Sequence, residues 1–212
     1  MRVEELINSI FDIREPKQYV ASKVMTGGFD MLDIADTLFS HKFRDLHCQH
    51  SFPILDEGNV KIIVDLIQKH IPNPVGVEVM SGKGWLSYWL KRSGIEVMAI
   101  TDNKTWKGFD WKLPTPVPIF NMDCVDAVKE FQLQGANLVI MSWPYMNDNA
   151  FKVLKVMKKG TWLLYIGESE SGCTADDDFF EFAYKHCEWF ASEEYFKQFH
   201  GIHDEPGLIL KK

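Results

Sequence analysis

The chain has 212 residues, of which 46% are hydrophobic and 25% charged, and its formal net charge is −7 at pH 7. These values are typical of a globular domain with a sizeable core, and we expect a single domain over residues 1–212. The acidic balance argues against nucleic acid as a partner, because tight non-specific binding neutralises phosphates with Lys and Arg. No apolar stretch approaches the ~20 residues that span a bilayer, so a membrane partner is not expected.

The four cysteines are Cys48, Cys124, Cys173 and Cys187, and they form no Cys-x-x-Cys pair. This spacing favours reduced thiols over a disulfide framework or a paired zinc site. The first residues also lack the apolar core of a signal peptide. We therefore expect a cytoplasmic protein without a metal, and the sequence leaves its oligomeric state open.

The first seventy residues predict mostly helix. Apolar residues recur at helical spacing over 3–11 and over 29–46. Asp56 is placed to cap a further helix that ends at His70. Residues 1–71 are thus expected to form a helical N-terminal extension to a core over residues 72–212.

Residues 75–103 are the most informative stretch. A β-branched run over 75–79 predicts a strand, Gly82 and Gly84 predict a tight turn, and residues 85–93 predict a helix. A second apolar run then ends at Asp102. Glycines at a strand-to-helix turn let a ligand approach the backbone, and the helix N-terminus offers free N–H groups. A carboxylate after the next strand can accept hydrogen bonds from a ribose, so the unit favours a nucleotide-like ligand.

Strand and helix continue to alternate after this unit. Strands are predicted over 118–122, 137–141 and 161–166, and two terminal strands over 189–199 and 208–210. Helices are predicted over 125–131, over 151–157 and after Thr174, which is expected to be an N-cap. The Trp- and Pro-rich segment 103–118 is expected to be a loop, either a lid over the site or a cover for the sheet edge. The alternation predicts an α/β fold with a seven-stranded, mostly parallel sheet and an antiparallel C-terminal strand. A ligand is then expected beyond the carboxyl ends of the strands.

The turn after the first strand resembles motif I of class I, Rossmann-like SAM-dependent methyltransferases, Glu-x-Gly-x-Gly-x-Gly. Glu78, Gly82 and Gly84 match it, and Met80 stands at the first glycine. The order of motifs resembles this superfamily over about residues 52–211, and more closely a group of small methyltransferase-like proteins. Features shared with that group include Ser142-Trp143-Pro144, and Gly167-Glu168 followed by Gly172-Cys173-Thr174. The resemblance implies a three-layer Rossmann-like fold and S-adenosyl-L-methionine (SAM) as cofactor.

The resemblance also implies a set of binding residues. Residues of the glycine turn would meet the methionyl and ribose part of SAM, Asp102 the ribose hydroxyls, and residues after the third strand the adenine. The implied cofactor-binding residues are Glu78, Met80, Ser81, Gly82, Gly84, Asp102, Asn103, Asp123, Cys124, Ser142 and Trp143. From the residues alone, Asp123 could equally be a helix N-cap and Asp102 a turn acid.

The fourth strand ends at Ser142-Trp143-Pro144-Tyr145, which resembles the [Asp/Asn/Ser]-Pro-Pro-aromatic motif of amino-group methyltransferases. It implies that Ser142 and the Pro144 carbonyl orient the methyl acceptor while Tyr145 packs on it, so these three are the candidate catalytic residues. Trp143 departs from the motif, and the segment could instead cover the core with aromatic area. Glu168 is either a base with a raised pKa or a solvated loop acid.

Three functions are compatible with this pattern. The first is a SAM-dependent methyltransferase that acts on an N or O nucleophile of a small molecule or a protein. The second is a catalytically inactive module with the same fold, because Met80 would crowd the methionyl part of SAM. The third is an NAD-dependent oxidoreductase, whose fingerprint has Gly or Ala where this chain has Ser87.

Overall fold

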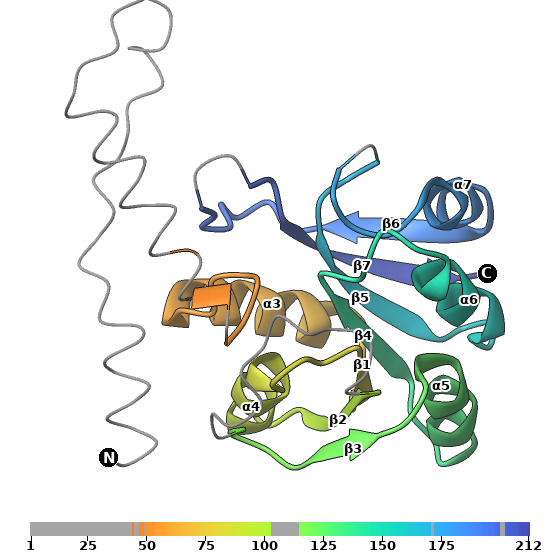
Figure 1. Ribbon diagram of the computed structural model, residues 1–212, viewed down its shortest axis with the longest axis horizontal. Helices are drawn as coiled ribbons and strands as arrows, with labels where there is room; N and C mark the ends of the chain where they lie inside the picture. The colour runs from red at the N-terminus through yellow and green to blue at the C-terminus, as the bar shows by residue number, and fades with distance from the viewer. Residues whose placement is uncertain (1–43, 45–46, 49, 103–114, 171, 200–201) are drawn as a thin grey trace, which may run out of the picture. The chain divides into compact units, whose positions relative to one another are not determined.

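The computed structural model describes residues 44, 47, 48, 50–102, 115–170, 172–199 and 202–212. The chain divides into two compact units, Met1–His47 and Cys48–Lys212, and the sheet with its helices belongs to the second (Figure 1). The helix predicted over 3–11, all but Arg44 of the helix predicted over 29–46, most of the Trp-rich loop, and Asn103 lie outside the described residues. The expectation of a single domain stays a prediction.

One mixed sheet organises the second unit. Its strands are β1 (Val75–Val79), β2 (Glu96–Thr101), β3 (Ile119–Asn121), β4 (Leu138–Ser142), β5 (Trp162–Gly167), β6 (Cys187–Ala191) and β7 (Glu205–Lys211). Among the described residues the sheet has 7 strands, in the order β3-β2-β1-β4-β5-β7-β6. Strands β1 to β5 pair in parallel, whereas β7 runs antiparallel to both β5 and β6. This confirms the predicted mostly parallel sheet with an antiparallel C-terminal strand.

Helices cover both faces of the sheet. They are α3 (Glu57–His70), α4 (Trp85–Arg92), α5 (Cys124–Leu133), α6 (Asn149–Val156) and α7 (Asp177–His186). In Figure 1, α3 and α4 lie on one face, and α5, α6 and α7 lie on the other. Among the described residues, no helix has both the length and the apolar character needed to cross a membrane.

Aspartate side chains cap the N-termini of three of these helices, α3, α5 and α7. Asp56 caps α3, as predicted, and its side chain accepts a hydrogen bond from the Asn59 backbone N–H at 2.9 Å. The prediction that Thr174 caps α7 is wrong, because Asp176 does so by accepting from the Phe179 N–H at 3.0 Å. Thr174 is buried, and its hydroxyl group bonds to Tyr165 and to the Glu168 carbonyl instead.

The strand predicted over 189–199 is shorter than expected and ends at Ala191. The backbone after it bonds to α3 rather than to the sheet. The Asn59 side chain accepts from the Lys197 N–H at 2.8 Å and donates to the Lys197 carbonyl at 2.8 Å. A buried amide therefore takes the backbone groups that a longer strand would have paired.

The core lies between the central strands and the layer formed by α5, α6 and α7. Val77, Val139 and Leu163 have no exposed surface and pack in one cluster with Leu154 and Phe179 from the helices. Burying a side chain of this size stabilises the fold by about 1.5–3 kcal/mol. The parallel strands are mostly apolar because both faces of the sheet are covered by helices. Most polar groups therefore lie where the strands end, and the candidate site is found there.

Candidate functional site

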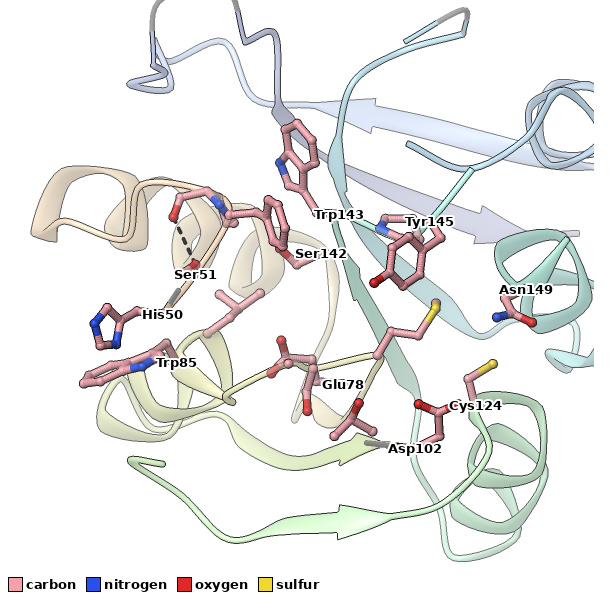
Figure 2. Close-up of a pocket in the computed structure, with 18 of the residues that line it drawn as sticks. His50, Ser51, Glu78, Trp85, Asp102, Cys124, Ser142, Trp143, Tyr145 and Asn149 are labelled. Atoms are coloured by element: carbon pink, nitrogen blue, oxygen red, sulfur yellow. Dashed lines mark hydrogen bonds between the residues drawn. The ribbon is translucent and has the colours of Figure 1, made fainter. Parts of the chain in front are cut away.

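A cavity of about 300 Å³ lies at the carboxyl ends of β1, β2 and β4 (Figure 2). Most of the residues predicted for the site line it: Glu78, Met80, Ser81, Gly82, Asp102, Asp123, Cys124, Ser142, Trp143, Pro144 and Tyr145. Gly84 is not among the lining residues, and Asn103 lies outside the described residues. Residues from six separate segments of the chain thus meet at one edge of the sheet.

The turn after β1 is built from left-handed backbone. Met80 has φ +56°, Gly82 has φ +53° and Gly84 has φ +75°. The Ser81 N–H donates to the Ile100 carbonyl at 2.9 Å, which fastens the turn to β2. A methionine in this region of φ is strained by about 1 kcal/mol relative to glycine. The structure therefore holds Met80 in a conformation that the glycine of the motif would adopt freely.

Gly84 has a packing role. A Cβ at this position would lie 2.8 Å from Val117 Cγ2 and 3.4 Å from Ala99 Cβ. The missing side chain allows the start of α4 to approach β2 and the chain before β3 closely. This close packing alone explains why glycine is needed at position 84, whether or not a ligand binds nearby. Contact between Gly84 and a cofactor stays a prediction.

Glu78 is buried in the middle of the sheet, with 2% of its surface exposed. Its Oε2 atom accepts hydrogen bonds from the Ser87 backbone N–H at 3.0 Å and from the Ser87 hydroxyl group. Burial raises the pKa of Glu78 to about 7, although the two bonds from Ser87 lower it. Ser87, which stands where the dinucleotide fingerprint has Gly or Ala, is thus the hydrogen-bond partner of Glu78.

Asp102 lies at the end of β2, in the part of the cavity that Tyr145 and Cys124 also line. Burial, followed by the Asp102 charge, raises the pKa of Tyr145 to about 12. Burial, Asp123 and Asp102 raise the pKa of Cys124 to about 11. At neutral pH the phenol and the thiol are therefore uncharged beside a carboxylate.

Asp123 has two roles at once. Its Oδ1 atom accepts from the backbone N–H groups of Val125 at 2.9 Å and Asp126 at 3.2 Å, so it caps α5. The same residue lines the cavity. The N-cap that the sequence allowed is confirmed, and contact with a ligand stays a prediction.

The segment after β4 is held by several contacts. Trp143 has φ +53°, and its backbone N–H donates to the Ile166 carbonyl at 2.7 Å. Its indole ring stacks on Phe52, with ring centroids 5.3 Å apart, and its Nε1–H donates to Asp204 at 3.3 Å. The Pro144 carbonyl already accepts from the Ala175 N–H at 3.1 Å. Among the described residues this carbonyl accepts no second hydrogen bond, so its other lone pair could accept one from a methyl acceptor.

Glu168 is neither the base nor the solvated loop acid that the sequence suggested. It is 8% exposed, so it is not a solvated loop acid, and it does not line the cavity as a base would. Its Oε2 accepts from the Cys173 N–H at 2.6 Å and its Oε1 from the His203 N–H at 3.3 Å. The carboxylate therefore holds two loops together.

The sequence interpretation missed one wall of the cavity. It comes from residues 50–53, none of which was predicted to bind a ligand, and from α4. His50 contacts Trp85 edge to face, with ring centroids 6.1 Å apart. Burial and the Lys83 charge lower the pKa of His50. The other lining residues are Ser51, Phe52, Pro53, Leu86 and Asn149, which the sequence did not indicate, and Thr101, Met122 and Cys173, which lie at predicted strand ends but were not named as binding residues.

Two buried polar atoms in this lining, Ser81 Oγ and His50 Nδ1, have no hydrogen-bond partner among the described residues. Buried polar groups are seldom left unpaired, so such atoms mark a place where a polar ligand or water is expected. The turn after β1 with its exposed backbone, the two unpaired polar atoms and the Asp102 carboxylate together suit a ligand with several hydroxyl or amino groups. In the described part of the chain, no cluster of His, Cys, Asp or Glu could hold a metal ion.

The sequence matches no protein-family model and no curated protein. Among solved structures, the chain is similar to a TehB-like SAM-dependent methyltransferase from Corynebacterium glutamicum, at 14% identity over 83% of this chain and 97% of that one, with a TM-score of 0.48. It is also similar to an O-methyltransferase from Bacillus cereus in complex with SAH, at 14% identity over 89% and 94%, with a TM-score of 0.49. A sugar N-methyltransferase from Streptoalloteichus has 10% identity over 74% and 87%, with a TM-score of 0.46. Identities this low do not transfer an acceptor to this chain.

Proposed function

We propose that this protein is a SAM-dependent methyltransferase that acts on an N or O nucleophile of a small molecule or a protein. The observation that carries the proposal is that one cavity gathers the glycine turn, the acid after β2 and the residues at the start of α5. This combination suits an adenosine: exposed backbone for close approach, a carboxylate for the ribose hydroxyls and the start of α5 for the base.

Each part of the cofactor has candidate partners in the lining. Asp102 would accept hydrogen bonds from the ribose hydroxyls, and Asp123 with Cys124 would lie beside the adenine. Gly82 and the Ser81 hydroxyl group, which lacks a partner among the described residues, would meet the methionyl part. When bound, SAM supplies an electrophilic methyl group on a sulfonium.

The acceptor would be positioned by the segment after β4. Ser142 and the remaining lone pair of the Pro144 carbonyl can accept hydrogen bonds from a nucleophile and direct its lone pair. A tyrosine is protonated at neutral pH, and burial and Asp102 raise the pKa of Tyr145 further, to about 12, so we expect it to donate a hydrogen bond rather than act as a base. Methyl transfer is an in-line displacement, so we expect these residues to contribute mainly by positioning and by excluding water.

A second candidate, a binding module without catalysis, is favoured by Met80. Its side chain lines the cavity where the family motif has glycine. A methionine could fill the methionyl site and leave room for a smaller nucleoside. The two candidates differ in which ligand binds, and this can be measured.

Thermal-shift and calorimetric titrations with SAM, S-adenosylhomocysteine (SAH), adenosine and NAD separate the candidates. The methyltransferase predicts that SAM and SAH raise Tm by several degrees at ligand concentrations about 100-fold above Kd. Asp102→Ala should abolish this shift. Asp126→Ala is the matched control, because that carboxylate is 69% exposed, pairs with Lys129 and does not line the cavity.

A shift with adenosine alone would favour the binding module, and a shift with NAD alone would favour the oxidoreductase. No shift with SAM or SAH would contradict the methyltransferase. An unchanged shift in Asp102→Ala would remove Asp102 from the site.

A further inference from the structure

The charged side chains that line the cavity are mostly of one sign. Glu78, Asp102 and Asp123 contribute carboxylates, and the lining among the described residues contains no Lys or Arg. Lys83 is buried in the adjoining turn, where its charge acts on His50. A partly enclosed cavity with this balance favours a cation over a neutral molecule of the same shape.

Glu78 is the most deeply buried of the three carboxylates. It lies in β1 between β2 and β4, and in the view of Figure 2 it lies between the end marked by His50 and Trp85 and the end marked by Asp102. Both bonds from Ser87 go to Oε2. The other carboxyl oxygen, Oε1, accepts no hydrogen bond from the described residues, so it can face a ligand.

The groups around Glu78 allow its charge to respond to a ligand. Ser87 on α4 is its hydrogen-bond partner, and the other polar or titratable groups that line the cavity with it include His50, Trp85, Asp102, Asp123, Cys124, Ser142 and Tyr145. Burial raises the pKa of Glu78 to about 7. A substantial part of the protein therefore carries a neutral Glu78 near neutral pH, and a nearby cation would favour the charged form.

We propose that Glu78 makes this cavity selective for the cationic methyl donor over its product, and that binding of the donor expels the proton from its carboxyl group. The inference rests on the proposed function, because SAM carries a sulfonium charge and SAH has an uncharged thioether at the same place. When the methyl group leaves, that charge disappears. The carboxyl group then takes a proton from solvent, and the attraction that held the donor is absent for the product.

Isothermal titration of SAM, SAH and adenosine, between about pH 6 and pH 8, tests this proposal. For the wild-type protein we expect SAM to bind about tenfold more tightly than SAH at the higher pH, and the preference to weaken as the pH falls. Repeating the titrations in buffers with different ionisation enthalpies should show that SAM releases more protons than SAH at the lower pH.

Two variants locate the effect. Glu78→Gln should weaken SAM binding about tenfold, change SAH binding by less than about threefold and remove the pH dependence of their ratio. Ser87→Ala retains the carboxyl group but removes one bond that lowers its pKa, so the preference for SAM should weaken at a higher pH than in the wild type. Ser87→Ala keeps the test available if Glu78→Gln does not fold.

Equal losses of SAM and SAH affinity in Glu78→Gln would overturn this inference, and so would a wild-type ratio that does not vary with pH. Either result would leave the proposed function standing. If neither SAM nor SAH binds the wild-type protein, the proposed function fails and the inference fails with it.

Discussion

Two strand-end turns of this protein carry the same residue types and use them in different ways. At the end of β1 the chain carries Glu78, then Gly82 and Gly84; at the end of β5 it carries Gly167-Glu168, then Gly172. Both glutamates are buried, at 2% and 8% exposure. In the first turn the acid lines the cavity, and among the described residues only its Oε2 atom accepts hydrogen bonds. In the second, both carboxylate oxygens accept backbone N–H groups of neighbouring loops.

The glycines differ in the same sense. Gly82 lines the cavity, so its missing side chain leaves space. A Cβ on Gly172 would lie 2.4 Å from Glu168 Cβ, and one on Gly167 would lie 2.7 Å from the Thr174 hydroxyl oxygen. These two glycines leave room for the hydrogen bonds of their own loop. An acid with glycines at a strand end therefore indicates a ligand site only when the backbone N–H groups of the neighbouring loops do not already occupy both carboxylate oxygens.

The largest effect is expected from Gly172→Ala. The new methyl group would collide with Glu168 Cβ and with the Ser169 carbonyl, which is 2.9 Å away, so the loop would have to move. We expect a loss of about 3–4 kcal/mol in the free energy of unfolding, measured by urea denaturation.

Gly207→Ala is the matched control for that change, because the nearest atom to its Cβ would be 3.8 Å away. It should change stability by less than about 1 kcal/mol. Similar losses in the two variants would contradict the idea that close packing in the turn after β5 leaves no room for a side chain at Gly172.

The second prediction compares the two acids through pH. Burial raises the pKa of Glu78 from 4.5 to about 7, so the neutral form stabilises the fold. That contribution is complete below the unfolded pKa and is lost as the pH rises through about 7. Between about pH 5 and pH 8, Glu78→Gln should therefore gain about 2–3 kcal/mol of stability relative to the wild type.

Glu168→Gln is the contrast, because an amide NH₂ would replace an oxygen that accepts a backbone N–H. It should be destabilised by about 2 kcal/mol, since one loop N–H would lose its acceptor. A Glu78→Gln variant whose stability relative to the wild type does not change with pH would refute the assigned titration of Glu78.

These two turns also show how far the sequence could lead. Apolar periodicity predicted the strands and helices of the sheet, because parallel strands buried on both faces read as apolar runs. The residues at their ends were predicted for the same reason, since those ends meet at one edge. The use of Glu168 by its own loop could not be predicted, because it depends on N–H groups of Cys173 and His203 brought together by the fold.

The wall formed by residues 50–53 was missed for a similar reason. His50 and Phe52 come from a segment without regular periodicity, and their roles follow from contacts with Trp85 and Trp143 far along the chain. The terminal strand was predicted too long because the amide of Asn59, a distant residue, takes the backbone of Lys197. Long-range polar contacts leave no local pattern in the sequence.

A third prediction separates space from backbone strain in the turn after β1. Gly84 and Gly94 both have positive φ, at +75° and +83°, but only the first has a close neighbour for a Cβ. Gly94→Ala should cost about 1 kcal/mol, and Gly84→Ala should cost about 1–2 kcal/mol more. Val117→Ala should recover the extra loss in the double variant, as thermal unfolding would show. Equal costs at the two positions would mean that the contact with Val117 is unimportant.

The smallest effect concerns Met80, which stands where the glycine motif that this turn resembles has its first glycine. Met80→Gly relieves a φ of +56° but removes partly buried apolar area, so stability should change by less than about 1 kcal/mol. The space that opens should tighten SAH binding about fivefold, which corresponds to about 1 kcal/mol. Met80→Leu keeps the bulk and the strain and should bind SAH as the wild type does. Weaker binding by Met80→Gly, measured by calorimetry, would mean that the methionine contacts the ligand rather than crowds it, because its loss would then remove apolar contact area from the bound state.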